Sequence, residues 1–483
     1  MISGTGGLEP VIGLEVHVQL RTREKLFCAD PTGFGGEPNT RVCPVCLGLP
    51  GALPVLNPQA VELAARTALA FGCTVHETSV FARKNYFYPD LPRGYQISQF
   101  ERPLATGGTF TLEGDDGPTT VRIRRIHLEE DAGKSLHDRF PEATAVDLNR
   151  AGTPLIELVT EPDLRSPSET RAWLQELKRT LEYLDVSDLS MEEGSLRVDA
   201  NVSLRPRGSQ VLGTKTEVKN MNSFSGVERA LEVEIRRQEG VLGEGGEVAP
   251  ETLLWDEVGG RVRTMRTKEE SQDYRYFPDP DLPPVVVSAD RVRELEGRIP
   301  ELPGARRARF VEEYGLPPYD ADVLTASRAV ADFYEEVARG VDDPKEASNW
   351  IMGPVLALRK DRAEEGARGE GDMPVPAGSL VELIGMVSSG QVSRSAAREV
   401  LGKMAATGKG PGRIVEEEGL GQVGDEDEIT RWVDEALAEN PEEAERLRGG
   451  EGRLRGFFMG QIMKKSGGRA DPGEAARILG ERL

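Results

Sequence analysis

The chain has 483 residues, which is enough for two to four domains. Hydrophobic residues make up 38% and charged residues 29%, as in water-soluble globular proteins, and no apolar run is long enough to cross a bilayer. Acidic residues outnumber basic ones by 82 to 60, and the net charge of -22 excludes a general nucleic-acid binder. The amino terminus lacks the basic and apolar parts of a secretion signal, so we expect a cytoplasmic protein without a membrane partner.

The first predicted element is a strand over residues 11–20, VIGLEVHVQL. Apolar and polar residues alternate strictly along it, which is typical of a half-buried strand. The polar face carries Glu15, His17 and Gln19. Residues two apart on a strand lie roughly 7 Å apart at their backbones, so Glu15 and His17 are close enough to reach one ion.

The cysteines come next along the chain, at Cys28, Cys43, Cys46 and Cys73. The Cys43-Pro-Val-Cys46 spacing is that of half a zinc site and does not suggest a disulfide framework. A single CxxC does not by itself identify zinc.

Residues 121–131, VRIRRIHLEED, predict a strand whose inward face changes phase. Apolar positions are odd-numbered at first and even-numbered later, which indicates a bulge in the Arg124-Arg125 pair. Beyond the bulge, His127, Glu129 and Asp131 are expected to share the open face, and Glu130 is expected on the covered side unless the strand ends before it.

Glu157 interrupts an apolar run, LIELV, and a buried carboxylate is costly unless it is paired or bound to a cation. Together, Glu15, His17 and Glu157 make a metal site about as well supported as a purely structural role for these residues. Hard cations prefer carboxylate oxygens, and imidazole is a frequent extra ligand. The alternative for Glu129-Glu130-Asp131 is a solvated acidic surface. Spacing does not show whether these strands meet.

Serine caps predict the helices. Ser166-Pro-Ser-Glu combines an N-cap, a proline at the first helical position and a capping-box glutamate, and Ser225 is expected to begin the next helix in the same way. A second strand with a polar face follows from SLRVDANVSLR, residues 195–205. From roughly residue 300 the pattern is helical only, with joins at 362–378 and 407–412.

We therefore predict an α+β protein. A mixed α/β body over residues 1–294, built on a sheet, is followed by two small helical modules, 295–405 and 406–483.

Phosphate chemistry lacks its usual motif, because there is no Walker loop and no dinucleotide glycine pattern. Lys84 and Lys134 are candidate phosphate contacts, and exposed solvated lysines are the alternative. Aromatic residues interleave with basic ones in RKNYFYPDLPRGYQISQ and DYRYFPDPDLPP, where they either frame a substrate pocket or pack proline-rich turns. The absence of HExxH and GxSxG disfavours common hydrolases.

Several stretches together resemble one family, the B subunit of the tRNA-dependent amidotransferase (GatB). These are GLEVHVQL, EPNTRVCPVCLGLPGALPVLN, RKNYFYPDLPRGYQISQ, HLEEDAGKSLH, VDLNRAGTPLIELVTEPDLRSP, MEEGSLRVDANVSLRP and KEESQDYRYFPDPDLPP. The tail segments SNWIMGPV and GFFMGQIMKKSGG are also similar, so the resemblance covers essentially the full chain.

The resemblance implies a subunit acting on misacylated Glu-tRNA(Gln), and in many lineages Asp-tRNA(Asn). ATP phosphorylates the side-chain carboxylate, and ammonia then displaces phosphate to give the amide. The resemblance also implies two partners, an amidase subunit (A) that releases ammonia from glutamine and a small clasp subunit (C). Mg²⁺ is expected because ATP and the substrate carboxylate are both anionic.

Carried across residue by residue, the resemblance assigns catalysis and Mg²⁺ binding to Glu15, His17, Glu130 and Glu157. Lys84 and Lys134, singled out above, are the expected contacts for ATP. Strand phase favours Glu129 as the ligand, whereas the resemblance favours Glu130. We adopt Glu130 because strand phase often fails at a strand's end.

The same resemblance implies zinc at Cys28, Cys43 and Cys46, where many relatives carry four cysteines. This chain has Asp30 in place of one, so either Asp30 or Cys73 completes the site or zinc binding is weakened or lost. In the tail, the resemblance implies contacts with tRNA, for which Lys464 and Lys465 are candidates. The alternative is that these two lysines stabilise a helix C-terminus.

Two rival functions follow from the same residues. In the first, the chain is a noncatalytic tRNA-binding scaffold whose acids only stabilise the sheet. In the second, it is a metal-dependent hydrolase that acts without partners, which the absence of a recognisable nucleophile disfavours.

Overall fold

The structure is a computed structural model that describes residues 7–112, 117–140, 142–267, 273–364, 373–422 and 426–483. It divides into two compact units, Met1–Leu302 and Pro303–Leu483. The first unit mixes strands and helices, whereas the described part of the second contains helices and no strand, which confirms the predicted α+β class. None of the helices within the described ranges is long and apolar enough to span a membrane.

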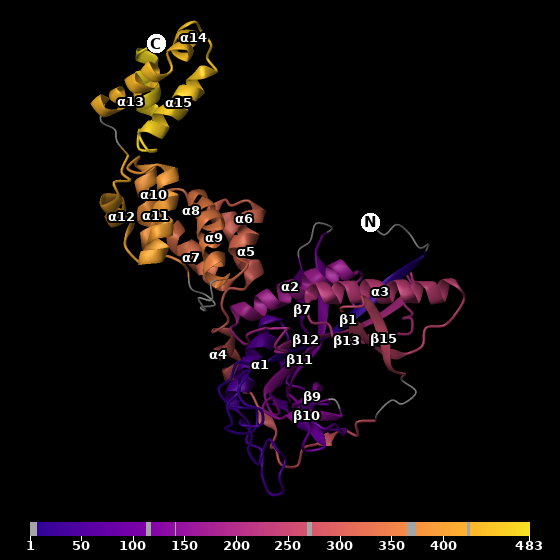
Figure 1. Ribbon diagram of the computed structural model, residues 1–483. Helices are drawn as coiled ribbons and strands as arrows, with labels where there is room; N and C mark the ends of the chain where they lie inside the picture. The colour runs from indigo at the N-terminus through magenta and orange to yellow at the C-terminus, as the bar shows by residue number, and fades with distance from the viewer. Residues whose placement is uncertain (1–6, 113–116, 141, 268–272, 365–372, 423–425) are drawn as a thin grey trace. The chain divides into compact units, whose positions relative to one another are not determined.

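A ten-stranded sheet forms the centre of the first unit (Figure 1). From one edge to the other, its strands are β15 (Arg261–Thr267), β14 (Glu251–Asp256), β13 (Thr216–Lys219), β12 (Leu196–Pro206), β1 (Leu8–Gln19), β11 (Pro154–Thr160), β8 (Thr119–Glu130), β6 (Ala105–Thr106) and β2 (Thr74–Val75), with β7 (Thr109–Leu112) also paired to β8. Neighbouring strands are antiparallel, except that β13 and β14 are parallel.

Strand β1 confirms the predicted alternation. Its even-numbered side chains from Ile12 to Val18 are buried in the main core, and helices α2 (Pro167–Tyr183) and α3 (Phe224–Gly243) contribute Trp173 and Leu231 to the same core. Figure 1 shows these two helices lying together over one face of the sheet. Each buried aliphatic side chain is worth roughly 1.5–3 kcal/mol, so a one-residue slip that exposed this face would be strongly unfavourable.

The bulge predicted in β8 is also present. Val159 of β11 pairs with Arg125, but the next residue, Thr160, pairs with Ile123, so Arg124 is the extra residue. The bulge lets apolar side chains point inward on both sides of it. His127 and Glu129 consequently face the side of the sheet opposite α2 and α3.

The helix caps confirm one expectation and correct another. Ser166 caps α2, and its side chain accepts a hydrogen bond from the Glu169 backbone at 3.1 Å. The cap of α3 is Ser223 and not Ser225: its hydroxyl accepts from the Gly226 backbone at 2.9 Å. Ser223 has the extended backbone that an N-cap requires, whereas Ser225 already lies in the first helical turn.

Smaller elements surround the sheet. They are the three-stranded sheet β16 (Phe277–Pro278), β4 (Phe81–Asn85) and β5 (Tyr95–Gln99), the pairs β9 (Lys134–Phe140) with β10 (Ala143–Asp147) and β3 (Thr78–Ser79) with β17 (Val285–Val286), and helices α1 (Pro58–Ala70) and α4 (Ala289–Glu296). The predicted body boundary after residue 294 falls inside α4.

Within the ranges that the structure describes, the second unit consists of helices and one π-helical turn. They are α5 (Pro303–Tyr314), α6 (Pro318–Leu324), α7 (Arg328–Ala338), α8 (Pro344–Trp350), η2 (Ile351–Val355), α9 (Leu356–Glu364), α10 (Ala377–Ser388), α11 (Arg394–Thr407), α12 (Pro411–Glu418), α13 (Glu426–Glu439), α14 (Pro441–Arg448), α15 (Leu454–Lys465) and α16 (Pro472–Glu481). Helices α13–α16 share a separate apolar core. Residues 365–372, which form the middle of the join predicted at 362–378, lie outside the described residues.

Candidate functional site

A row of four polar residues crosses the centre of the sheet. His127 of β8 lies opposite Glu157 of β11, Glu157 lies opposite His17 of β1, and His17 lies opposite Arg197 of β12. Side chains directly opposite one another on neighbouring strands have Cβ atoms about 4.5–5.5 Å apart. The sheet register therefore brings together residues that are far apart in the sequence.

Glu129 completes a cluster with this row. One ligand atom each from His17, Glu129 and Glu157 lie within 4.8 Å of one another, and both carboxylates are buried. Burial acts to raise the pKa of Glu157, but the neighbouring imidazoles of His127 and His17 outweigh this effect, and the pKa is lowered. Two ionised carboxylates and an imidazole, gathered at one point, are suitable ligands for a divalent cation.

Glu130, the ligand predicted in preference to Glu129, lies elsewhere. Its two carboxylate oxygens accept hydrogen bonds from Arg93 Nη1 at 2.7 and 2.9 Å, and one also accepts from the Ile97 backbone at 3.1 Å. After the bulge, β8 pairs with β11 without a further shift as far as Glu130, so the neighbouring acids Glu129 and Glu130 point to opposite faces. The residues Glu15, His17, Glu130 and Glu157 are therefore not gathered around one point.

Glu15 belongs to a second cluster on the same face, with Asp199 of β12 and Glu217 of β13. Burial and nearby carboxylates raise the pKa of Glu15. The ammonium of Lys219 bonds to Asp199 and lies 2.9 Å from Glu217 Oε1, and Asn201 donates to Glu15 at 3.2 Å. The Lys219 ammonium therefore already supplies a positive charge to the carboxylates of this second cluster.

Lys84 of β4 faces the first cluster. Its ammonium lies 5.9 Å from the ring centroid of Tyr86 and 5.1 Å from that of Tyr274. Burial acts to lower the pKa of Lys84, but the carboxylate charges, chiefly that of Glu129 and also that of Glu157, outweigh it and raise the pKa. The predicted aromatic segments thus form a wall beside the carboxylates.

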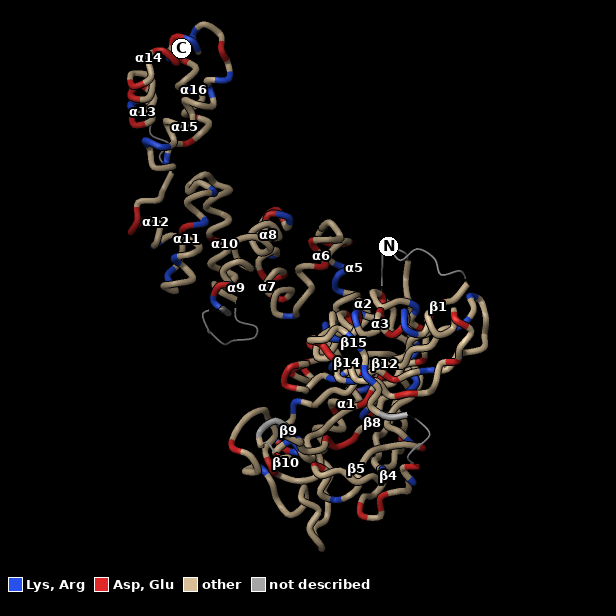
Figure 2. Tube along the Cα trace, turned by 45° about the vertical axis from the view of Figure 1, so that its right-hand side comes forward, with Lys and Arg blue, Asp and Glu red and all other residues tan. Residues whose placement is uncertain are grey.

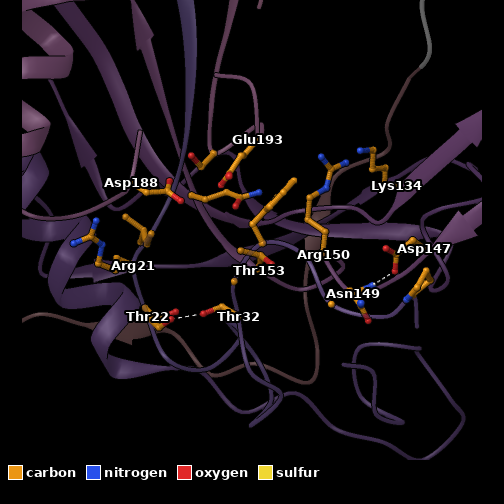
Figure 3. Close-up of a pocket in the computed structure, with 18 of the residues that line it drawn as sticks. Arg21, Thr22, Thr32, Lys134, Asp147, Asn149, Arg150, Thr153, Asp188 and Glu193 are labelled. Carbon is orange, nitrogen blue, oxygen red and sulfur yellow. Dashed lines mark hydrogen bonds between the residues drawn. The ribbon is translucent and has the colours of Figure 1, made fainter. Parts of the chain in front are cut away.

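A cavity of about 670 Å³ lies beside the cluster. It is lined by Gln19, the last residue of β1, and by Thr153, which directly precedes β11. Figure 3 shows Lys134 and Arg150 on one side of the cavity and Asp188 on the other. The two lysines predicted to contact phosphate therefore differ in place: Lys84 is beside the carboxylates, whereas Lys134 lines the adjoining cavity.

The predicted zinc ligands gather in one place. Cys28, Asp30, Cys43 and Cys46 bring one ligand atom each within 4.8 Å of one another, and Asp30 Oδ2 lies 3.2 Å from the Cys46 sulfur. Cys73 is outside this group, buried after α1, where burial raises the pKa of its thiol to about 12. The structure thus offers Asp30, and not Cys73, as the fourth ligand.

The two tail lysines differ in their surroundings. Lys465 pairs with Glu439 and lies 3.7 Å from Glu435, whereas exposed Lys464 has no charged partner within the part of the chain that the structure describes. Lys and Arg are interspersed with Asp and Glu along the second unit (Figure 2). Basic residues in the described part of the tail therefore stand among acidic ones along the chain, and Lys464 is a candidate for a single basic contact.

Sequence reasoning missed several residues of these clusters. Asp199 stands on the predicted polar face of SLRVDANVSLR, so strand alternation was the signal that could have found it. Arg197 stands on the same predicted face as Asp199, whereas Glu217 and Arg93 follow no predicted pattern, because strand pairing and a loop contact bring them to their places.

Comparison with known proteins defines the class. The family model described as GatB/GatE catalytic domain matches residues 10–293, and the model described as GatB domain matches residues 332–483. The first unit is therefore a catalytic domain of the GatB/GatE class.

Curated relatives narrow the class to one family. Proteins named as the B subunit of aspartyl/glutamyl-tRNA(Asn/Gln) amidotransferase are 52% identical to this chain in Moorella thermoacetica, 50% in Thermoanaerobacter pseudethanolicus and 49% in Persephonella marina. Each alignment covers 98% of this chain and 99% of the relative. The chain belongs to the family of amidotransferase B subunits, as its motifs predicted.

Proposed function

We propose that this chain acts within a tRNA-dependent amidotransferase that converts Glu-tRNA(Gln) to Gln-tRNA(Gln), Asp-tRNA(Asn) to Asn-tRNA(Asn), or both. The names of relatives 48–52% identical over nearly the whole chain support this substrate class. The observation that carries a catalytic role is the cluster of His17, Glu129 and Glu157 at the centre of the catalytic domain, with both carboxylates buried.

The proposed reaction has two steps. The side-chain carboxylate of the aminoacyl group attacks the γ-phosphorus of ATP, and ADP leaves. Ammonia then attacks the resulting acyl phosphate, loses a proton and displaces inorganic phosphate, which leaves the amide. Both reactants of the first step are anionic, so positioning and charge neutralisation dominate its barrier.

The residues of the cluster fit Mg²⁺, because they offer two carboxylate oxygens and one imidazole nitrogen within 4.8 Å. His17, Glu129 and Glu157 would hold the ion, whose chemistry is to neutralise charge on the phosphate oxygens. Lys84 supplies a fixed positive charge beside these carboxylates, and Lys134 offers one in the adjoining cavity. We propose these two lysines as contacts for ATP phosphates.

We further propose that an amidase subunit and a small third subunit complete the enzyme. The naming of the relatives as B subunits supports a complex of several chains. In that complex the amidase would release ammonia from glutamine, and added ammonium would bypass it.

The test is amide formation by the complex on Glu-tRNA(Gln) with Mg²⁺, ammonium and ATP labelled in its γ-phosphate. We expect Gln-tRNA and labelled phosphate in equal amounts, and neither product without ATP. Equal amide formation in the absence of ATP would contradict the phosphorylation step, and labelled phosphate release by the isolated chain without tRNA would favour a hydrolase.

We also propose a zinc ion at Cys28, Asp30, Cys43 and Cys46. The buried ammonium of Lys25 supports it: Lys25 donates to the Arg41 carbonyl at 2.7 Å and lies 3.7 Å from the Cys46 sulfur. A buried ammonium is costly unless negative charge lies nearby. Zinc-bound thiolates would provide that charge, because a coordinating thiol is deprotonated.

We expect about one zinc per chain in the purified protein, measured by atomic emission after dialysis. Asp30→Ala and Cys46→Ala should each lower the zinc content by at least about tenfold, because a tetrahedral site loses one of four ligands. Cys73→Ala is the matched control and should retain all of the zinc. Full zinc in Asp30→Ala would rule out Asp30 as a ligand.

We expect substitutions of the two tail lysines to affect tRNA binding differently. Lys464→Ala should reduce the slope of log affinity against log salt by about 1, as expected for the loss of one phosphate contact. Lys465→Ala should change the slope less, because Glu435 and Glu439 already compensate its charge. Fluorescence anisotropy with labelled tRNA at several salt concentrations measures both, and equal slopes for the two variants would contradict this assignment.

A further inference from the structure

Two imidazoles lie against the carboxylates of Glu129 and Glu157. His17 Nε2 is 3.6 Å from Glu129 Oε1 and 3.5 Å from Glu157 Oε2. His127 Nε2 is 3.6 Å from the other Glu129 oxygen, Oε2, and 3.4 Å from the same Glu157 oxygen. The two carboxylates are therefore bracketed between imidazoles from β1 and β8.

The two histidines differ in exposure and in their second ring nitrogen. The side chain of His17 is 19% exposed, whereas that of His127 is 2% exposed. His127 Nδ1 is buried and has no hydrogen-bond partner among the residues that the structure describes. A hydrogen on Nδ1 would be a buried donor without an acceptor, which costs about 1–3 kcal/mol, and such orphaned N–H groups are rarer than unpaired acceptors. The hydrogen therefore belongs on Nε2, which faces the carboxylates.

An Nε2 atom that carries a hydrogen has no lone pair for a metal ion, and His127 is not among the three groups that converge within 4.8 Å. On the basis of the proposed metal site, we infer that His127 is a positioning residue. It donates its Nε2–H to Oε2 of Glu157, the oxygen that His17 also faces, shared with Oε2 of Glu129, and leaves Oε1 of Glu129 turned toward His17.

Glu157 depends on this contact more than Glu129 does. Ser98 donates its hydroxyl to Glu129 at 3.1 Å, which fixes that carboxylate independently. Across the described ranges, the polar contacts of the Glu157 carboxylate are with the two imidazoles alone. If His17 binds the ion, His127 remains the one imidazole that orients Glu157. Partners that orient a metal-binding carboxylate typically contribute 10–100-fold to metal affinity.

The test uses the full chain and Mn²⁺ as a paramagnetic probe. The Mn²⁺ dissociation constant is measured from the signal of free Mn²⁺ in electron paramagnetic resonance, and pulsed resonance counts the imidazole nitrogens bound to the ion. Imidazole coupling identifies the site, because the cluster of Glu15, Asp199 and Glu217 contains no histidine. His17→Gln should abolish that coupling.

We expect one bound imidazole in both wild type and His127→Phe, and a dissociation constant about 10–100-fold higher in the variant. His127→Gln, which keeps an N–H donor, should bind more tightly than His127→Phe. The control is His76→Phe, because His76 contacts Thr106 at 2.8 Å, outside the cluster, and its dissociation constant should equal that of wild type.

Two outcomes would overturn the inference while leaving the metal site in place. Two bound imidazoles in wild type would make His127 a ligand, and this result does not depend on any variant folding. Unchanged affinity in His127→Phe would show that it positions nothing. In contrast, wild type without any imidazole-coupled Mn²⁺ would refute the proposed metal site itself, and the role of His127 with it.

Discussion

Glu157→Gln is expected to slow ammonium-dependent amide formation by roughly 10²–10³-fold, with the protein still folded. The substitution keeps the shape of the side chain but removes one of the two ionised carboxylates beside His17. ATP and the substrate carboxylate would then meet without full charge neutralisation. The measurement is the initial rate of Gln-tRNA formation by the complex at saturating ATP over a series of Mg²⁺ concentrations.

Glu161→Gln is the matched control, because Glu161 follows the same strand but pairs with Arg124 at the surface. It should retain wild-type activity. Glu129→Gln should raise the Mg²⁺ concentration needed for half-maximal rate, whereas Glu130→Gln should leave it unchanged. Full activity in Glu157→Gln would place the chemistry elsewhere and reduce this chain to a scaffold.

Arg93→Met is expected to destabilise the first unit by about 3–5 kcal/mol, because it leaves the Glu130 carboxylate buried and unpaired. Arg93 holds both Glu130 oxygens, and its remaining nitrogens donate to the Val45 carbonyl at 2.8 and 3.3 Å. The melting temperature of the unit should fall by roughly 10 °C. A scan of thermal unfolding measures this change.

Two comparisons test the physical reason for that loss. The double variant Arg93→Met/Glu130→Leu should recover much of the stability, since an apolar pair replaces a buried ion pair at little cost. Arg124→Met removes a surface partner, exposed by 58%, and should cost no more than about 1 kcal/mol. If Arg93→Met alone were as stable as wild type, Arg93 would not compensate a buried charge.

The stability lost in Arg93→Met should also depend on pH. Burial raises the pKa of Glu130 even in the presence of Arg93, and removing Arg93 would raise it further. A group whose pKa is raised by folding stabilises the folded state below its unfolded pKa and loses that contribution as pH rises through the folded pKa. The deficit of Arg93→Met should therefore shrink as the pH falls toward the pKa of an ordinary glutamate, about 4.3.

Much of the site could be predicted from the local alternation of apolar and polar residues. The pairing between strands could not be predicted in this way. The open face of β1 and the bulge in β8 both followed from the order of apolar residues, and strand phase alone favoured Glu129. The motif resemblance pointed to Glu130, because two adjacent acids in HLEED match a motif equally well whichever side they face. The register that sets His17 opposite Glu157 depends on packing between distant segments, which no local pattern encodes.

The bulge at Arg124 makes the spacing of residues in β8 more important than their identity. If one residue were deleted there, strict alternation would run through the whole strand, and one of its two halves would turn its apolar side chains outward. Either the half paired with β7 would lose its core, or His127 and Glu129 would exchange places with Ile126 and Leu128. An insertion or deletion between Ile123 and His127 should therefore be selected against more strongly than any substitution of Arg124 or Arg125.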